Sequence, residues 1–283
     1  MTTPVIDIHP HVIAPDEARY PRAPIGGEAS PWSQSRPVAA PGMVAAIDEA
    51  GISKSVLVQA STCYGHDNSY VADSVACYPQ RFAGVFSVDV LAADAPQRIR
   101  YWVNRGLVGL RIFAAGHTRP DQPDWMDDPK SFPAWECCEA LGIPVCMQMR
   151  TPGLPQLDNL LTRFPKVKVI LDHLGRPTLD DGPPYRAADS LFALARHDNL
   201  YLKYTTHTIR DARKGKATPE SFLDRVIGEF GAARIAWGSN FPASEGSLAS
   251  IKAECDAVLA SRSETERAQI LGGTALTLYP SLA

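Results

Sequence analysis

The sequence lacks the features of a membrane, secreted or nucleic-acid-binding protein. None of its apolar runs approaches the length of about 18 residues that a membrane-spanning helix needs. Its N-terminus enters a predicted strand at once, without the basic segment and long apolar stretch of a secretory signal. A net charge of −3 leaves no basic excess to attract nucleic acid or an anionic membrane. We therefore expect a cytoplasmic protein that binds neither.

The cysteines show no C-x-x-C spacing, which argues against a structural zinc site built on them. Two of them, Cys137 and Cys138, are adjacent in a segment with helical character. We expect all six to be reduced and mostly buried as small hydrophobic residues: Cys63, Cys77, Cys137, Cys138, Cys146 and Cys255.

The N-terminal stretch V-I-D-I-H-P-H, residues 5–11, carries the first chemical signal. Alternating β-forming residues run into a His-X-His pair, so His9 and His11 should leave the end of a short strand on the same side. Two imidazoles in that arrangement can share a cation or a carbonyl oxygen. The polar, Pro- and Gly-rich residues 15–37 that follow are too irregular for a turn and predict a functional or disordered loop.

Short apolar strands then alternate with helical segments along the whole chain. The first predicted strand leads into the His-X-His pair within residues 5–11. The other seven cover residues 55–59, 82–88, 107–113, 144–149, 167–171, 200–204 and 234–237. The predicted helices cover residues 38–50, 68–78, 95–104, 132–140, 154–164, 188–196 and 219–230, and two more lie within 248–278. Eight such units, buried on both strand faces, predict one (β/α)8 TIM-barrel domain over residues 1–283 with extra C-terminal helices.

A doubly wound open sheet is the alternative fold. It is disfavoured because no G-x-G-x-x-G motif or P-loop follows any strand and because the strand count is eight.

In a barrel, catalytic groups lie at the C-terminal ends of the strands and in the loops that follow. His173 follows the sixth strand, so it can meet His9 and His11 near the barrel axis. Three histidine nitrogens supply the ligands of a zinc-type site with one open position, although a metal-free site is equally consistent with them. No Lys is present in the fourth strand, so a lysine-bridged two-metal centre is not supported.

Arg111 lies inside the otherwise apolar strand L-V-G-L-R-I-F. A buried cation needs a partner, and the sequence offers two alternatives for Arg111. One is an anionic group of a substrate; the other is an ion pair with Asp89 or Asp172.

Further polar residues follow the other strands and are candidate substrate contacts, each with a plainer alternative. Tyr64 stands in Y-G-H-D-N, where Asp67 or Asn68 can simply cap a helix. His207 and Arg210 stand in K-Y-T-T-H-T-I-R, which also reads as a polar loop. Ser61 and Arg150 follow the second and fifth strands, and His117 and His197 are expected at the surface.

After the eighth strand the sequence reads W-G-S-N-F-P. Asn240 therefore stands where a carboxylate could act as a general base or a metal ligand, and an amide cannot take a proton at neutral pH.

Five segments together resemble the amidohydrolase-2 family, in particular its branch of lactone hydrolases that includes 2-pyrone-4,6-dicarboxylate lactonase. They are D-I-H-P-H, Y-G-H-D-N, G-L-V-G-L-R, L-D-H-L-G-R-P and W-G-S-N-F-P, and the resemblance runs in order from about residue 5 to residue 280. D-H-L-G-R-P in its place is the specific signal, and His-X-His alone is a weak one.

The resemblance implies a distorted barrel in which His9, His11 and His173 polarise a lactone carbonyl while an aspartate after the eighth strand activates water. It also implies that Arg111 binds a substrate carboxylate and that Arg210 binds another. Other branches hold a catalytic zinc, and some decarboxylate aromatic acids. Asn240 departs from this pattern. Three explanations are open for the absence of a carboxylate at this position. They are a metal-bound hydroxide, another base such as His207 or Asp172, and a reaction that needs no base there.

The primary hypothesis is a hydrolase that opens a small carboxylated lactone or related cyclic ester or amide from catabolism. In it, Asn240 donates a hydrogen bond to the reacting group. The alternatives are a decarboxylase or other lyase acting on an aromatic or unsaturated acid, and a non-catalytic homologue that binds a metabolite. The sequence leaves the substrate, the metal and assembly into homo-oligomers open.

Overall fold

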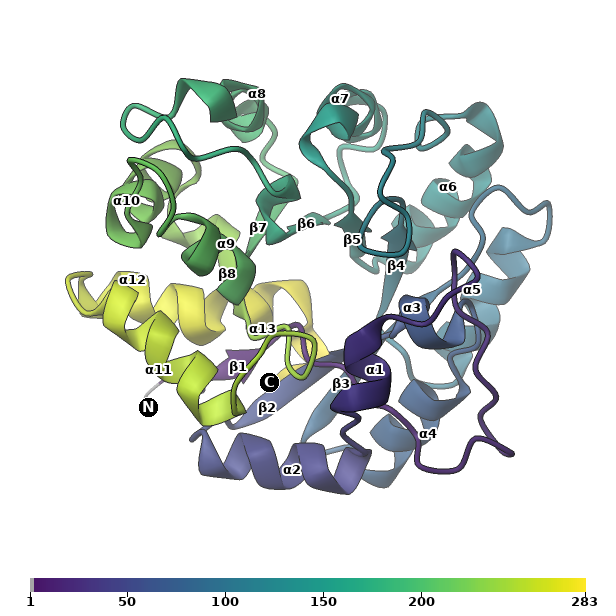
Figure 1. Cartoon of the computed structure of the whole chain (residues 1–283). Helices are drawn as coiled ribbons and strands as arrows, with labels where there is room; N and C mark the ends of the chain where they lie inside the picture. Colours follow the sequence, from purple (N-terminus) through teal and green to yellow (C-terminus); the bar gives the residue numbers. More distant parts are fainter. Residues whose placement is uncertain (1–2) are drawn as a thin grey trace.

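The chain folds into a parallel β-barrel surrounded by helices (Figure 1). The computed structural model describes residues 3–283, within which one eight-stranded sheet has the order β1 to β8. All seven neighbouring pairs of strands are parallel. The strands are β1 (Ile6–Asp7), β2 (Lys54–Val58), β3 (Phe82–Ser87), β4 (Gly109–Phe113), β5 (Val145–Gln148), β6 (Val169–Asp172), β7 (Leu200–Thr205) and β8 (Ile235–Gly238).

The barrel closes between β8 and β1 through a small number of polar contacts. The backbone N–H of Ile8 donates to the carbonyl of Trp237 at 3.2 Å. The carboxylate of Asp7 accepts the N–H groups of His9, at 3.0 Å, and of Ser239, at 2.8 Å. Asp7 thus joins the residue that follows β8 to the first imidazole of the His-X-His pair.

The helices alternate with the strands and cover the outside of the barrel. They are α1 (Pro31–Ser35), α2 (Ala40–Glu49), α3 (Ser61–Tyr64), α4 (Ser69–Cys77), α5 (Ala95–Asn104), α6 (Phe132–Leu141), α7 (Leu154–Arg163), α8 (Asp189–Phe192), α9 (Thr206–Asp211), α10 (Pro219–Phe230), α11 (Leu248–Leu259), α12 (Glu264–Ala268) and α13 (Thr274–Leu278). A π-helical turn, Gln269–Gly273, joins α12 to α13, and short 3-10 turns include His173–Gly175 after β6.

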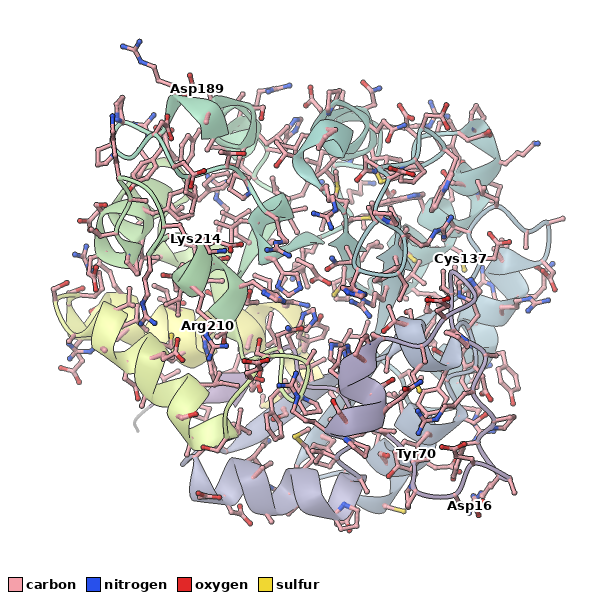
Figure 2. The ribbon with its side chains drawn as sticks, in the orientation of Figure 1. Asp16, Tyr70, Cys137, Asp189, Arg210 and Lys214 are labelled. Atoms are coloured by element: carbon pink, nitrogen blue, oxygen red, sulfur yellow. The ribbon has the colours of Figure 1, made fainter. Side chains whose placement is uncertain are left out.

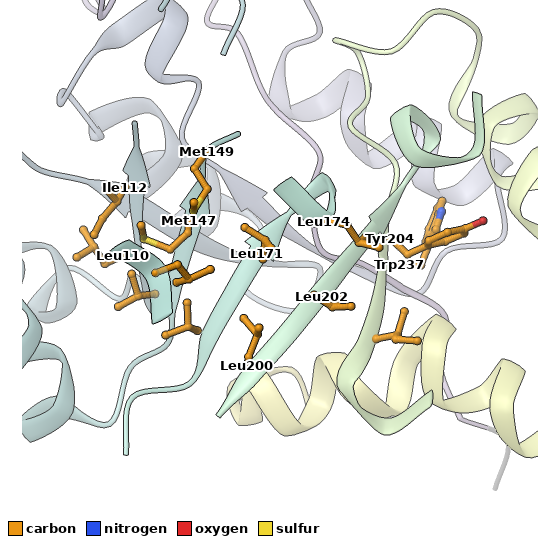
Figure 3. Packing of buried hydrophobic residues seen from close by; sticks show 14 of the residues in the cluster. Leu110, Ile112, Met147, Met149, Leu171, Leu174, Leu200, Leu202, Tyr204 and Trp237 are labelled. Atoms are coloured by element: carbon orange, nitrogen blue, oxygen red, sulfur yellow. The ribbon is translucent and has the colours of Figure 1, made fainter. Parts of the chain in front are cut away.

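Strand alternation divides the core into two parts. Outward side chains such as Leu110, Met147, Leu171 and Leu202 pack against the helices (Figure 3). Inward apolar side chains, among them Ile6, Val85 and Ile170, form a second cluster that Tyr279 and other residues at the C-terminal end of the chain complete.

Inward positions nearer the strand C-termini carry polar groups instead. Arg111, Asp172 and Lys203 are buried on β4, β6 and β7. The apolar part of the barrel interior therefore supports a polar layer directly above it.

The predicted barrel and its eight strands are confirmed, and the open-sheet alternative is wrong. Among the local differences, residues 15–37 contain α1, and the segment after β7 forms α9 rather than a loop. The C-terminal stretch holds three α-helices instead of two, because a π-turn interrupts it. Five of the six cysteines are buried, Cys77 being exposed, and all are free. No helix among residues 3–283 is long and apolar enough to cross a membrane.

Gly238, the last residue of β8, gives a test of the barrel closure. A Cβ at this position would lie 2.6 Å from the Cβ of His9, which leaves no room for any side chain. We expect Gly238→Ala to lower the free energy of unfolding by about 1–3 kcal/mol through overpacking. Gly228 on α10 is the matched control, because nothing lies within 4 Å of a Cβ there. Thermal unfolding of the two variants measures the difference, and equal stability would contradict the close packing of His9 on β8.

Candidate active site

A cavity of about 450 Å³ opens at the C-terminal end of the barrel. It is lined by residues from several strands and from the loops and short helices that follow them: His11, Ser30, Pro31, Trp32, Arg36, Ala60, Thr62, Arg111, Phe113, Gly116, His117, Gln148, Arg150, His173, Arg176, His207, Asn240, Ala243 and Glu245. Its position is the one expected for the active site of a TIM barrel.

Four imidazoles form a continuous row beneath and beside this cavity. The ring of His9 lies 5.0 Å from that of His11 and 4.9 Å from that of His173, and His173 lies 5.0 Å from His207. His11, His173 and His207 line the cavity, whereas His9 is fully buried below them. The structure brings His9, His11 and His173 together as neighbours, and His207 extends the row.

Burial keeps these imidazoles neutral. It lowers the pKa of His11 to about 3, with the charge of Arg111 adding to the effect. Burial and the charge of Arg176 lower the pKa of His207 to about 4. Burial also holds the pKa values of His9 and His173 well below their usual range. At neutral pH each ring therefore has one N–H donor and one acceptor nitrogen.

The neighbours of His11 decide which of its nitrogens carries the proton. Its Nδ1 lies 2.8 Å from the backbone oxygen of Val58, which can only accept, so Nδ1–H donates and Nε2 holds the lone pair. The indole of Trp32 stacks on the ring at 5.3 Å, with 27° between the planes. Because its one N–H is directed at Val58, a neutral His11 in this tautomer can only accept a hydrogen bond from a group in the cavity.

His173 has a different environment. Its Nδ1 lies 2.7 Å from the hydroxyl of Thr205, which can donate to it and leave Nε2–H as a donor. His173 has a φ of 54°, and Asn240 one of 58°, both in the left-handed region that non-glycine residues seldom adopt. Such backbone strain is concentrated at functional sites, and here it occurs where β6 and β8 end.

A buried ion cluster forms the floor of the site. The ammonium of Lys203 lies 2.7 Å from Oδ1 of Asp172. Nε of Arg111 lies 3.8 Å from Oδ2 of the same carboxylate, and Nδ1 of His9 lies 3.7 Å from Oδ1. All four side chains are buried.

Of the partners predicted for Arg111, the structure places Asp172 near its guanidinium. Asp172 is its nearest carboxylate, but 3.8 Å is too long for a hydrogen bond. Its guanidinium donates from NH1 to the carbonyl of Gln59 at 2.7 Å and lies over the ring of Phe113, while the side chain lines the cavity. The remaining donors form no hydrogen bond with other described residues, so they can meet an anion in the cavity.

The other predicted contacts divide into two groups. Arg150 and His207 line the cavity. Ser61 and Tyr64 do not line it: their backbone and side chains hold the N-terminal segment, through the N–H of Ile25 to the carbonyl of Ser61 and the N–H of Ala14 to the hydroxyl of Tyr64.

Arg210 also lies outside the cavity. It points from α9 toward α11 (Figure 2), where its guanidinium binds the carboxylate of Glu254 at 2.7 Å. Because that carboxylate already compensates its charge, the placement does not support the predicted substrate contact. Asp211 and Lys214, which follow on the same segment, also pair with each other.

Several residues of the site were not found in the sequence. Trp32 lies in α1 and Arg36 directly follows that helix, both in the long N-terminal loop, whose side-chain positions no local pattern predicts. Arg176 follows His173, and its guanidinium also pairs with Asp211. Lys203 could have been recognised from the sequence, since it is a charged residue in an apolar strand just as Arg111 is.

Asn240 lies beside His207 because of the strand register. Thr205 of β7 pairs with Gly238 of β8, so the residues two positions further on become neighbours. The hydroxyl of Thr206 ties the two strand ends together by donating to the carbonyl of Ser239 at 3.0 Å. The amide nitrogen of Asn240 lies 3.1 Å from Nε2 of His207 and 3.1 Å from the hydroxyl of Ser244.

The arrangement of donors does not fit a divalent metal. No group of three or more His, Cys, Asp or Glu side chains in residues 3–283 is placed to hold one ion, so His9, His11 and His173 are neighbours without converging as ligands. The carboxylate of Asp172, 3.7 Å from Nδ1 of His9, faces Lys203 and Arg111. Two cations therefore already occupy the centre of the polar layer.

The chain matches the model of a family described as amidohydrolase over residues 6–281. Among curated proteins, it is similar to L-fucono-1,5-lactonase from Burkholderia ambifaria, with 26% identity over 243 residues that cover 81% of this chain and 80% of the relative.

Solved structures of similar fold carry different activities in their descriptions. A protein from Pseudomonas putida described as a 2-pyrone-4,6-dicarboxylic acid hydrolase has a TM-score of 0.80 and 22% identity, covering 100% of both chains. An amidohydrolase from Burkholderia multivorans with bound zinc has a TM-score of 0.78 and 21% identity, covering 98% of this chain and 99% of that one. A 2,6-dihydroxybenzoate decarboxylase from Rhizobium has a TM-score of 0.71 and 17% identity, with coverage of 98% and 99%. At these identities the likeness shows the fold alone.

Metal analysis tests the ligand geometry directly. Because no three donors converge on one point among the described residues, we expect the purified protein to contain substoichiometric zinc, manganese and iron by elemental analysis. Since a ligand stabilises a protein only when it binds the folded state, adding zinc or a chelator should leave the melting temperature unchanged. One equivalent of tightly held metal that is lost in His11→Ala would contradict this expectation.

Proposed function

The chain belongs to the amidohydrolase family, whose model covers nearly all of it, and on that premise we propose that it opens a small carboxylated lactone by attack of water on the ring carbonyl. The observation that carries the proposal is the convergence of a buried guanidinium, Arg111, with the imidazoles of His11 and His173 on one cavity. The family membership and the lactonase relative make it an enzyme of the hydrolase type.

The charges of the cavity favour an anionic substrate. Four guanidinium groups line it, those of Arg36, Arg111, Arg150 and Arg176, against a single carboxylate, that of Glu245. Arg111 is the most deeply buried of the four, and its nearest carboxylate is beyond hydrogen-bond distance. A buried cation without a close anion is costly, so a substrate carboxylate here would gain charge-assisted hydrogen bonds.

The size and walls of the cavity agree with a small ring compound. A volume of about 450 Å³ is within the range of small-molecule sites. Trp32 and Phe113 supply aromatic surface for the ring to pack against.

The tautomers of the histidines assign different tasks to them. With Thr205 donating to its Nδ1, His173 can donate from Nε2 to the lactone carbonyl oxygen, where negative charge develops during attack. His11, whose Nε2 accepts, is suited to hold the attacking water or a hydroxyl group. Asp172 and Lys203 lie below both and keep His9 and Arg111 in place.

A decarboxylase is the second candidate. It is favoured by the shared fold with the Rhizobium 2,6-dihydroxybenzoate decarboxylase and by Asn240, since loss of carbon dioxide needs no water-activating base at that position. The same arginines would then hold the carboxylate of an aromatic acid.

A substrate panel separates these functions. We expect acid release from a carboxylated lactone such as 2-pyrone-4,6-dicarboxylate, with a kcat/KM at least about tenfold above that for neutral sugar lactones such as L-fucono-1,5-lactone, because one charge-assisted contact is worth at least about 1.5 kcal/mol. A pH indicator follows acid release, and a carbon dioxide assay with 2,6-dihydroxybenzoate serves as the counter-test. Carbon dioxide release without lactone opening would replace the proposal with the decarboxylase. Tight binding without turnover would indicate a metabolite-binding homologue.

Arg111→Met tests the anion contact. We expect KM for the carboxylated lactone to rise roughly 10- to 100-fold, since the variant loses charge-assisted hydrogen bonds of about 1.5–3 kcal/mol. KM for a neutral lactone should change little. Arg210→Met is the matched control, because Arg210 lies outside the cavity and binds Glu254. Equal KM values for the wild type and Arg111→Met would exclude the contact.

A further inference from the structure

The proposed reaction needs a group that accepts a proton from water, and residue 240 cannot be that group. The amide of Asn240 has no basic site at neutral pH. The residues around it, however, include neutral imidazoles, each with a nitrogen that can accept a proton. The ring that takes the proton is identified by its hydrogen bonds and by its exposure to the cavity.

His9 and His173 are poorly placed for this task. His9 is buried below the cavity and does not line it. His173 has its Nδ1 against Thr205, and the donor at Nε2 is needed for the carbonyl oxygen. His11 also has an acceptor nitrogen, but its ring is the more deeply buried of the two that remain, and it forms a hydrogen bond with the side chain of Asn240.

His207 combines exposure to the cavity with a partner that fixes its ring. It is the second residue of α9, which begins immediately after β7, and it lines the cavity and is only partly buried. Nε2 faces the amide of Asn240 at 3.1 Å, and Nδ1 forms no hydrogen bond with another described residue. The amide can turn over so that its oxygen accepts both from Nε2–H of His207 and from the hydroxyl of Ser244, which lies 3.1 Å from the same end. The lone pair of His207 is then on Nδ1.

The charged groups around His207 come from three elements. Arg176, from the loop after β6, and Arg210 and Lys214, from α9 and the turn that follows, favour the neutral ring, while Asp211 on α9 favours the protonated one. Asp211 is itself paired with Arg176 and Lys214. The neutral ring is thus the resting state from which a proton can be accepted.

We propose that His207, oriented by Asn240, is the general base that activates water in this site. The inference rests on the proposed lactone hydrolysis. Water attacks the ring carbonyl carbon while its proton passes to Nδ1 of His207, and Nε2–H donates to the amide oxygen of Asn240. When the tetrahedral intermediate collapses, the bond from the carbonyl carbon to the ring oxygen breaks, and the proton passes from His207 to that oxygen. Asn240 is then the orienting partner of a base, the role that a third group has in catalytic triads.

The test compares the wild type, His207→Gln and the double variant that combines His207→Gln with Asn240→Asp. The substrate is the carboxylated lactone that the wild type turns over. Loss of a general base typically costs about 10²- to 10⁴-fold in rate, so kcat of His207→Gln should fall by that factor while KM stays within about threefold. In the double variant, the carboxylate of residue 240 stands beside the vacated imidazole position and can accept the proton. We expect its kcat to exceed that of His207→Gln at least about tenfold.

His197→Gln is the matched control. His197 precedes β7, at the opposite end of the barrel, where it binds Asp158 at 2.5 Å, so its loss should leave kcat unchanged. Calorimetric binding of the hydrolysis product to each variant shows whether the site is intact. Unchanged kcat in a product-binding His207→Gln protein, or a double variant no faster than His207→Gln, would overturn the assignment. A wild type that opens no lactone would instead refute the proposed function.

Discussion

The carboxylate of Asp172 is the point on which the arrangement of the active site depends. It lies inside the barrel, where an unpaired charge would be expensive, and it is stabilised by Lys203 at 2.7 Å. Arg111 on β4 and His9, which follows β1, face the same carboxylate. Four inward residues from β4, β6, β7 and the end of β1 are thereby held together, and the histidines that line the cavity pack on this layer.

The strand register supplies the rest of the geometry. Parallel pairing brings successive strand ends to one face, so His11, His173, His207 and Asn240 meet although as many as 229 positions separate them, from His11 to Asn240. Closure by Asp7 and the glycine at position 238 lets β8 approach His9 closely. The chemistry of the site therefore depends on backbone packing as much as on the polar side chains.

Asn240 has a different meaning in the sequence and in the structure. In the sequence W-G-S-N-F-P it stands where a carboxylate is expected, so the expected general base is absent. In the fold its amide lies between His207 and Ser244, so the position still contributes a polar group that can hold an imidazole. The preference for anionic substrates has a similar origin, because Arg36 and Arg176 join Arg111 and Arg150 only after the loops fold over the barrel.

The sequence by itself determined the barrel, its eight strands and the group of His9, His11 and His173, because strand periodicity and the position of residues at strand ends are local properties. It also identified Arg111, since a charge in an apolar strand needs a partner wherever the strand lies. Only the tertiary structure decided that Arg210 binds Glu254 outside the cavity, that Trp32 stacks on His11 and that Lys203 binds Asp172. Those contacts join segments far apart in the chain. They follow from strand register and loop paths, which no local pattern of residues specifies.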